Sequence, residues 1–510
     1  MRLTILAAFL VGLVYSFYHW AIPNLWQVKP YSPLTLNELS PSFAVDETFF
    51  YAPKIAQPLA DPGELVGSGL MALLAKISGG IDKAFMLADF IFPALTFLIL
   101  AYLLNLWLKN RLLALTTALF VLTFYHYLTY FPYLPSVVKL MVEYWKEGSY
   151  SSLIRSFHPQ ISLGLFFLFA ARPNWFTLTL LTYTHFFYWT IAFVWLIIYR
   201  FGRKLIKTII PWLILTLPYW LFIIQRLPAK DYWARNYYFV PITLNQALLL
   251  AFGFLLALKN KYWLSFYIAV TLAIAAASVT KFGADDPIGH WFLRVVNPMT
   301  AILIVVSLFN KLKLKPALLM IIFFLVLGFQ FRLHWQYFKN NAKAFEIEPE
   351  KLEAFNWLKQ NTPKDSVVAA GMKESLYLPA YTQNISYLKQ AQLNQANNQE
   401  LLQRFLDVNK LAGVSKEQLI LMFSNQQELK AKKRFDFDNC AGNFLFFRLY
   451  KGSDYYDCSI PEDKLKQILT QYESISPQLT FPADYWLSMD YVDFGQLLWE
   501  NKTYKIYALP

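Results

Sequence analysis

The chain has 510 residues, of which 56% are hydrophobic, 18% aromatic and only 15% charged, and its formal net charge is +13. Roughly a quarter of the residues of a soluble protein are charged, so this composition excludes an ordinary soluble domain and indicates a polytopic membrane protein. Lys and Arg concentrate in short loops between apolar segments, which is typical of cytoplasmic loops and argues against nucleic-acid binding.

The apolar segments predict transmembrane helices along residues 1–332. The first, at about 3–22, lacks a small-residue cleavage site after its apolar run, so we expect a retained signal anchor. The other clear segments are long enough to cross a hydrocarbon layer of ~30 Å. They lie at about 85–108, 112–130, 208–225, 243–258, 262–280, 291–309 and 316–332. Residues 159–200 are ambiguous because Arg172-Pro173-Asn174 interrupts them, and the expected total is about nine to eleven passes.

The basic loops predict the orientation of these passes. If the first helix runs outward, the loops at 109–111, 259–261 and 311–315 fall inside. Residues 200–207 also fall inside only if 159–200 make an odd number of passes. The same count places the loops 23–84, 131–158 and 226–242 outside. Within the large first loop, residues 64–77 suit a helix lying on the membrane surface, although ordinary core packing is equally compatible.

Residues 333–510 are more polar and predict a small extracytoplasmic domain of the α/β or α+β class. Residues 349–362 have helical spacing and end before Pro363, and residues 366–370 predict a buried strand. Cys440 and Cys458 flank a further predicted strand, 444–450. An outside location permits a disulfide between them, and two free thiols are the alternative.

An acidic pair, Asp46-Glu47, lies in the first outer loop of this mostly apolar chain. Charged residues near a bilayer are costly unless they have a partner or a task. The expected topology gathers basic side chains on the same side, and the candidates for binding a phosphate are Arg155, His158, Arg294 and Lys281. A carboxylate can take a proton from an acceptor, and basic groups stabilise a leaving phosphate. The alternative is structural: Asp46 could pair with Lys54, and Asp89 with a neighbouring helix.

The sequence predicts no obligatory cofactor. It has no His/Cys cluster with the spacing of metal ligands and no nucleotide-binding loop. A divalent ion could still bind Asp46 and Glu47 together with phosphate oxygens. His126 and His185 lie among aromatic residues, and we interpret them as groups that make core hydrogen bonds.

Several segments resemble the GT-C superfamily of membrane glycosyltransferases. Asp46-Glu47 followed by Phe49-Phe50-Tyr51 is similar to the acidic first-loop motif of the protein mannosyltransferase and aminoarabinose transferase branch. Residues 352–365 resemble the helix-strand entry to the outer domain in that family. Residues 157–160 and 183–190 resemble segments of uncharacterised prokaryotic members. No Trp-Trp-Asp-Tyr-Gly stretch occurs, which argues against an oligosaccharyltransferase.

The resemblance implies an enzyme: inverting transfer of a sugar from a polyprenyl-phosphate donor to a glycan, lipid or protein acceptor at the outer leaflet of the plasma membrane. It makes Asp46 the expected general base, with Glu47 second. The roles of the basic residues come from charge and topology instead. The alternatives are a transporter or flippase of a lipid-linked or anionic substrate, for which no internal repeat is visible, and a non-catalytic assembly protein.

Overall fold

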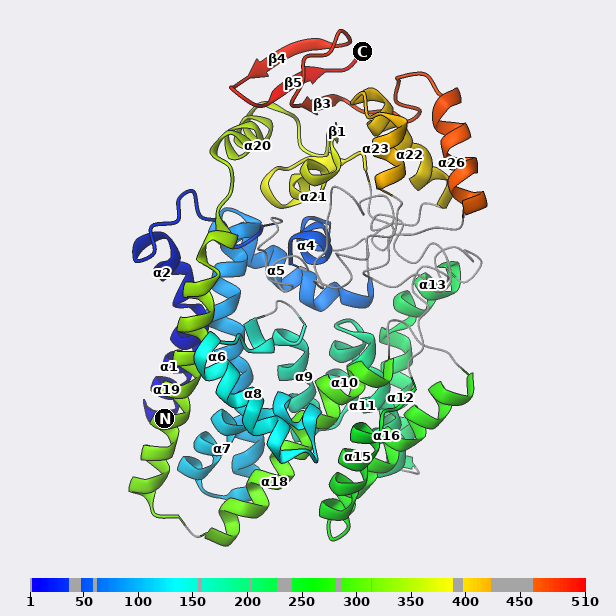
Figure 1. The fold of residues 1–510 in the computed structure, drawn as a ribbon. Coiled ribbons are helices and arrows are strands. Elements are labelled where there is room, and N and C mark those ends of the chain that lie inside the picture. The colour runs from blue at the N-terminus through cyan, green and yellow to red at the C-terminus, as the bar shows by residue number, and fades with distance from the viewer. Residues whose placement is uncertain are drawn as a thin grey trace.

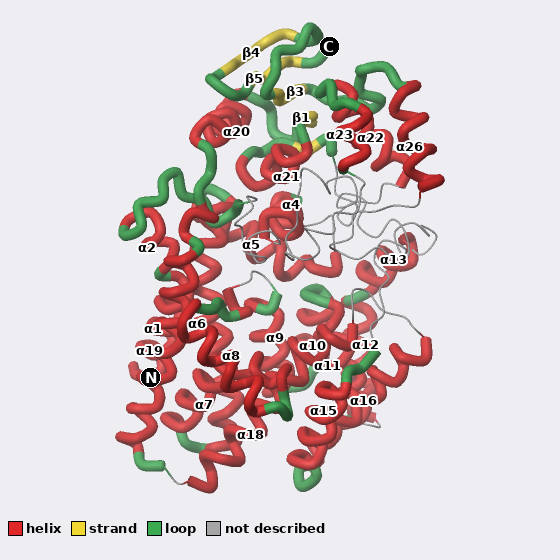
Figure 2. Tube along the Cα trace, viewed as in Figure 1, coloured by secondary structure: helices red, strands yellow, loops and turns green. Residues whose placement is uncertain are grey.

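The computed structural model describes residues 2–35, 47–57, 62–154, 158–200, 203–226, 241–280, 287–312, 314–388, 398–422 and 462–510. These residues are mostly helical, and the strands gather in the C-terminal part of the chain (Figure 2). Figure 1 shows a helical bundle with the C-terminal domain at one end. The first-loop helices α4 (Ala52–Ala56) and α5 (Leu65–Ser78) lie between the two.

Every clear apolar segment of the sequence is helical. Five spans in the described residues are long and apolar enough to cross a membrane. They are α6 (Ile81–Leu108), α7 (Arg111–Phe124) with η4 (Tyr125–Tyr130), α16 (Lys261–Thr280), the run of α17 (Pro287–Trp291), η6 (Phe292–Val296) and α18 (Asn297–Leu312), and α19 (Pro316–Asn340).

Two bent pairs of helices raise this number to seven if each pair is one span. They are α1 (Arg2–Ser16) with α2 (Tyr18–Asn24), bent by 43°, and α12 (Arg203–Leu215) with α13 (Leu217–Arg226), bent by 59°. The expected nine to eleven passes require shorter apolar helices to cross as well, such as α15 (Leu244–Ala257). Residues 131–158, which the sequence predicts as the second outer loop, contain α8 (Leu134–Glu147) and η5 (Ser152–Ile154).

The ambiguous residues 159–200 form three short helices, α9 (Gln160–Ala171), α10 (Trp175–Thr182) and α11 (Phe186–Tyr199). The ends of α9 and α11 line one cavity together with Asn260 from the basic loop before α16. The opposite end of α10 meets the first loop, where the amide of Val66 donates to the carbonyl of Tyr183 at 2.8 Å. The segment therefore traverses the bundle an odd number of times, as the basic loops require.

This arrangement gives the bundle two distinct ends. We call the end at Trp107, Arg200 and Asn260 the basic end, because these residues line one cavity beside the basic loops. We call the opposite end, which carries the C-terminal domain, the domain end (Figure 1). An α-helix rises about 1.5 Å per residue, so α10, which has eight residues, is only about 12 Å long.

The C-terminal domain has a mixed five-stranded sheet in the order β2-β1-β3-β5-β4. The strands are β1 (Val367–Ala370), β2 (Ile385–Ser386), β3 (Tyr485–Ser488), β4 (Gln496–Glu500) and β5 (Lys505–Ala508). Strand β1 is parallel to β2 and β3, whereas β5 is antiparallel to β3 and β4. The predicted helix at 349–362 and strand at 366–370 are confirmed as α20 (Pro349–Asn361) and β1.

Helices cover both faces of this sheet, because alternate side chains of a strand point to opposite faces. Val368 and Ala370 pack with α20 and α21 (Met372–Tyr381), whereas Ala369 packs with α22 (Asn398–Leu411) and α26 (Glu462–Ser474). The short α23 (Lys416–Leu421) contacts α26. Cys440, Cys458 and the predicted strand at 444–450 lie outside the described residues.

The domain docks on the first loop. The Ser32 amide donates to the Phe345 carbonyl at 2.9 Å, at the end of η7 (Ala342–Phe345), and the Ile347 amide donates to the Pro30 carbonyl at 3.1 Å. Helix α21 contacts α4, α6 and the π-helical turn η1 (Glu47–Tyr51). The turn that begins at Glu47 is thus enclosed between the bundle and the domain.

A buried polar network ties the first helices to α6 and α9. Asp89 accepts a hydrogen bond from the Tyr18 hydroxyl at 2.5 Å, and the same oxygen lies 3.0 Å from Nε2 of His19. The amide of Gln160 donates to the other oxygen. Nδ1 of His19 is in turn 2.5 Å from the Tyr31 hydroxyl. Asp89 of α6 is therefore paired with side chains of the neighbouring helix α2, which confirms the structural alternative considered for this residue.

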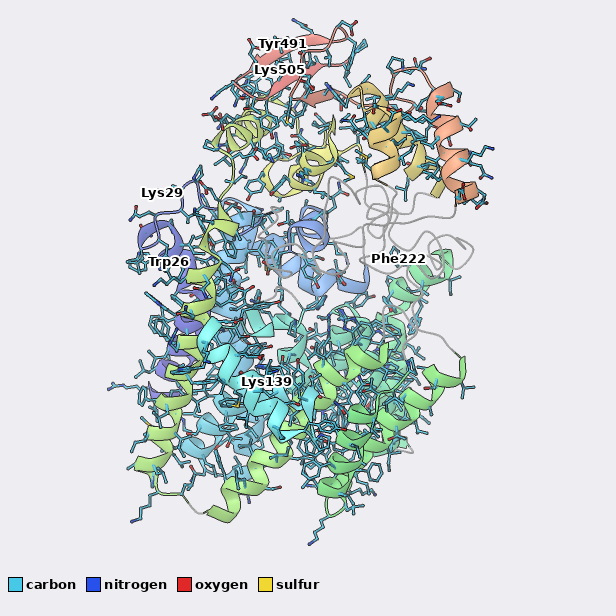
Figure 3. The ribbon with its side chains drawn as sticks, in the orientation of Figure 1. Trp26, Lys29, Lys139, Phe222, Tyr491 and Lys505 are labelled. Atoms are coloured by element: carbon cyan, nitrogen blue, oxygen red, sulfur yellow. The ribbon has the colours of Figure 1, made fainter. Side chains whose placement is uncertain are left out.

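We expect Asp89→Ala to destabilise the fold strongly. Removing one partner of a buried charged pair costs about 3–5 kcal/mol, because the groups left behind are buried without compensation. The measurement is the free energy of unfolding in detergent micelles. Glu143→Ala is the control, since that carboxylate is half exposed and 3.9 Å from Lys139, labelled in Figure 3. Equal stability of the two variants would contradict a supporting role for Asp89.

Candidate functional site

The acidic first-loop segment leads directly into a cluster of charged and imidazole side chains. Glu47, Tyr51 and Lys54 follow one another at intervals of four and three residues, so they share one face of the η1–α4 helix. Glu47 is only 2% exposed. The ring of Tyr51 lies 5.7 Å from the ring of His158 between centroids. Pro53 in the first turn favours the start of α4 at this point.

Glu64 is the carboxylate at the centre of the cluster. It ends the 3₁₀ turn η3 (Pro62–Glu64) just before α5. Oε2 of Glu64 is 2.5 Å from Nζ of Lys54, and Oε1 is 3.5 Å from Nε2 of His158. Burial raises the pKa of Glu64, but the nearby Lys54 ammonium and the contact with His158 outweigh burial and lower it to about 2. Glu64 is therefore ionised at neutral pH.

His158 is fully buried immediately before α9. Burial lowers its pKa to about 4, against the raising effect of Glu64, so the ring is neutral at pH 7. Its Nδ1 lies 3.2 Å from the Ser162 hydroxyl. The neutral tautomer with hydrogen on Nε2 satisfies both neighbours, because Nε2–H faces Glu64 and Nδ1 can accept from Ser162.

His185 links this group to the bundle. Its ring centroid is 4.0 Å from that of His158, and Nε2 is 3.1 Å from an Nη of Arg294. Its Nδ1 is 3.3 Å from the amide of Phe187, at the start of α11. Burial, together with the charges of its neighbours, lowers the pKa of His185 well below its usual value. A neutral imidazole accepts at one nitrogen only, so these two donors compete for it.

Arg294 carries a charge that no described carboxylate balances. It is 7% exposed, and its guanidinium lies 5.8 Å from the centre of the Phe187 ring. No ion pair joins it to a carboxylate within the described part of the chain, whereas Lys54 is paired with Glu64. A buried charge without a counter-ion is costly. The cluster is therefore complementary to an anion placed beside Arg294 and Lys54.

The cluster also contains donor atoms for a metal ion. Glu64, His158 and His185 each offer one ligand atom, and these atoms all lie within 4.8 Å of one another. One carboxylate and two imidazoles are a donor set that suits zinc. If Nε2 of His158 held a metal, the ring proton would move to Nδ1, which would then donate to the Ser162 hydroxyl as the second nitrogen of a ligating histidine does. Lys54 and Arg294 would repel a bare cation, so the set fits a divalent ion best when an anion binds with it.

Comparison with solved structures aligns this chain with the oligosaccharyltransferase of Archaeoglobus fulgidus. The form tethered to an acceptor peptide with the NVT sequon is 13% identical, with a TM-score of 0.34 over 84% of this chain and 67% of that chain. The apo form is 14% identical, with a TM-score of 0.31 over 85% of this chain and 68% of that chain. The complex with an inhibitory peptide and a dolichol-phosphate is 12% identical, with a TM-score of 0.32 over 78% and 64%. No family model and no curated protein matches the chain.

The structure brings together two of the basic residues predicted from the sequence. His158 and Arg294 both contact His185. Glu47 is buried at the start of the helix that carries Tyr51 and Lys54. Asp46, Arg155 and Lys281 lie outside the described residues, so their roles stay predictions.

Three residues of the cluster were not predicted as site residues. Glu64 follows the sequence Asp61-Pro62-Gly63, a turn signal that places it at the start of an apolar helix, and this position was available from the sequence. Lys54 pairs with Glu64 here. His185 does contact a backbone amide, as a core histidine would, but it also faces Arg294.

We expect stability to fall between pH 7 and pH 5. The ordinary pKa of histidine is near 6.5, so His158 of the unfolded chain becomes protonated as the pH falls from 7 to 5. In the folded protein the pKa of His158 is about 4, so the buried ring stays neutral over this range. The unfolded state then binds more protons, and this group alone lowers the free energy of unfolding by about 2 kcal/mol at pH 5. The Lys54–Glu64 pair does not contribute to this change, because its stabilisation is lost only as pH falls toward about 2.

The measurement is the unfolding free energy of the wild type and of His158→Gln at pH 7, 6 and 5. The free energy of unfolding should depend less steeply on pH between 5 and 7 in the variant, because the variant lacks a group that binds a proton in the unfolded state and not in the folded state. An unchanged slope would show that His158 is not held neutral by burial.

Proposed function

We propose that this protein is a membrane glycosyltransferase of the GT-C type. It transfers a sugar from a polyprenyl-phosphate donor to an acceptor at the domain end of the bundle, with inversion. The observation that carries the proposal is buried Arg294, which has no carboxylate partner among the described residues and lies in one cluster with Lys54 and His158. The sequence resemblance to GT-C enzymes supports the same class.

The proposed step divides the work between the two kinds of charge. The acceptor nucleophile gives its proton to Asp46 as its electron pair forms a bond to the anomeric carbon. The bond from that carbon to the phosphate oxygen breaks, and its electron pair leaves with the phosphate. Arg294 and Lys54 stabilise the charge that develops there. Attack opposite to the leaving group accounts for inversion.

His158 and His185 have positioning roles in this proposal. Both are neutral at pH 7, so they add no charge of their own. His158 orients Glu64, which fixes Lys54, and His185 holds the Arg294 guanidinium from one side. A divalent ion, if held by Glu64, His158 and His185, would supply further positive charge for a phosphate.

The proposal is tested with the purified full-length protein in nanodiscs. Polyprenyl-phosphate sugars with a radiolabelled sugar are supplied together with a lipid and protein extract, and transfer of label into the extract is followed by chromatography. We expect label to leave the donor only when the protein is present. Label that crosses the bilayer of proteoliposomes while remaining on the donor lipid would overturn the enzyme in favour of a flippase.

A further inference from the structure

A second polar cavity lies at the basic end of the bundle, across the short helices from the cluster of Glu64 and Arg294. Its volume is about 580 Å³, within the usual range of small-ligand sites. The ends of α6, α9 and α11 and the start of α16 form its walls. The turn between α9 and α10, at Arg172 and Pro173, completes the lining.

The polar groups that line this cavity are cationic or neutral. Arg172 and Arg200 both line it, and no carboxylate does. Neither arginine forms an ion pair within the described residues. The guanidinium of Arg172 lies 5.9 Å from the centre of the Tyr102 ring. Asn260 accepts the backbone amide of Tyr262 at its side-chain oxygen, which leaves its NH₂ group as a further donor. The chemistry is that of a site for an anion.

Packed aromatic rings make the cavity wall rigid. The ring centroids of Trp107 and Trp263 are 4.8 Å apart, and those of Tyr199 and Tyr262 are 4.9 Å apart. The Tyr262 hydroxyl donates to the carbonyl of Ala170, which ties α16 to α9. Trp and Tyr concentrate where a bilayer meets water, so the composition of this wall suits a position at headgroup level.

We propose that this cavity binds the anionic headgroup of a phospholipid in the cytoplasmic leaflet. That leaflet carries the negative lipids, and basic residues near its surface attract them. The cavity is next to the loops that contain Lys109, Lys259 and Lys261, which are exposed. Its acidic ligand would contact Arg172 and Arg200, while the acyl chains remain in the bilayer beside the helix ends. The proposal does not rest on the glycosyltransferase function.

The test compares lipid binding to the full-length protein in neutral detergent micelles. Binding of phosphatidylglycerol is measured by native mass spectrometry for the wild type, for R172Q/R200Q and for the control K259Q/K261Q, which removes the same charge from residues outside the cavity lining. Each basic contact near a membrane surface is worth a few-fold in affinity, so we expect the arginine pair to lose about thirty-fold. The control should lose much less.

Further arms identify the ligand and guard against misfolding. A photoactivatable phosphatidylglycerol should label the wild-type peptides that contain Trp107, Arg172 or Tyr262, which requires no variant. An equal loss in the control variant, equal binding of phosphatidylcholine, or labelling elsewhere on the protein would overturn the proposal. Full displacement of the lipid by millimolar inorganic phosphate would assign the cavity to free phosphate instead.

Discussion

Replacing Arg294 by glutamine is expected to lower the rate of sugar transfer by about 10²–10³-fold, the usual loss when one group that stabilises developing negative charge is removed. Arg294 is buried, lies 3.1 Å from Nε2 of His185 and has no carboxylate partner in the described part of the chain. Its charge is therefore available to a phosphate. The measurement is transfer of label from a polyprenyl-phosphate sugar in nanodiscs.

Two further variants separate phosphate binding from simple support of the fold. Arg294→Lys keeps the charge but not the planar fork, so it should recover part of the activity. Arg332→Gln is the matched control, because this half-exposed arginine lies 5.5 Å from the centre of the Trp145 ring, away from the cluster, and should tolerate the change. The wild type should also be inhibited by polyprenyl phosphate more strongly than Arg294→Gln. Unchanged inhibition together with a lowered melting temperature would make Arg294 purely structural.

The positions of the long helices could be predicted because their cause is local. A run of apolar residues must pair its own backbone groups in a bilayer, and only a helix does so within one segment. Thus α6, α16 and α19 follow from hydropathy alone. Hydropathy does not predict where a helix bends. The breaks between α1 and α2 and between α12 and α13 depend on tertiary packing as well as on composition.

The three helices of residues 159–200 show what the sequence could not decide. None of them reaches ~30 Å, the thickness that a lone span must cross. Most residues of α9 are buried, so neighbouring protein rather than lipid surrounds it. Short helices are tolerated in such surroundings. The basic residues 200–207 favour an odd number of passes only if that loop lies inside, and neither the number nor the lengths of these helices could be decided from the sequence.

The composition of the site was only partly predictable for the same reason. His158 and Arg294 stood out because charged or imidazole groups beside apolar segments need a partner. Glu64 contacts His158, and His185 contacts Arg294, and each pair is about 100 positions apart in the chain. No rule of sequence spacing predicts such contacts. Long-range contacts of this kind follow from the packing of α5, α9 and α11, which hydropathy does not determine.

The short helices also explain why two polar sites can exist in so apolar a bundle. The cluster at the domain end and the cavity at the basic end lie at opposite ends of α10 and α11. Helix α10 rises only about 12 Å, so the segment of chain that joins the two sites is short. A donor lipid and a bound phospholipid would then approach the same thin region from opposite leaflets.

Asp46→Asn is expected to abolish most of the transfer activity, by about 10²–10⁴-fold, because an amide cannot take the proton of the acceptor. The variant should still bind polyprenyl phosphate, since Arg294 and Lys54 are unchanged. Glu47→Gln should lose less, because the Glu47 side chain is only 2% exposed.

Asp82→Asn is the matched control for Asp46→Asn. It removes a carboxylate in the first turn of α6, at the same end of the bundle but outside the proposed machinery, so transfer should stay near the wild-type rate. Single-turnover kinetics with labelled donor distinguish the steps: a base variant binds donor normally and fails in chemistry, whereas a phosphate variant binds donor poorly. Wild-type turnover by Asp46→Asn would remove the proposed base and leave the buried cations as a binding site without catalysis.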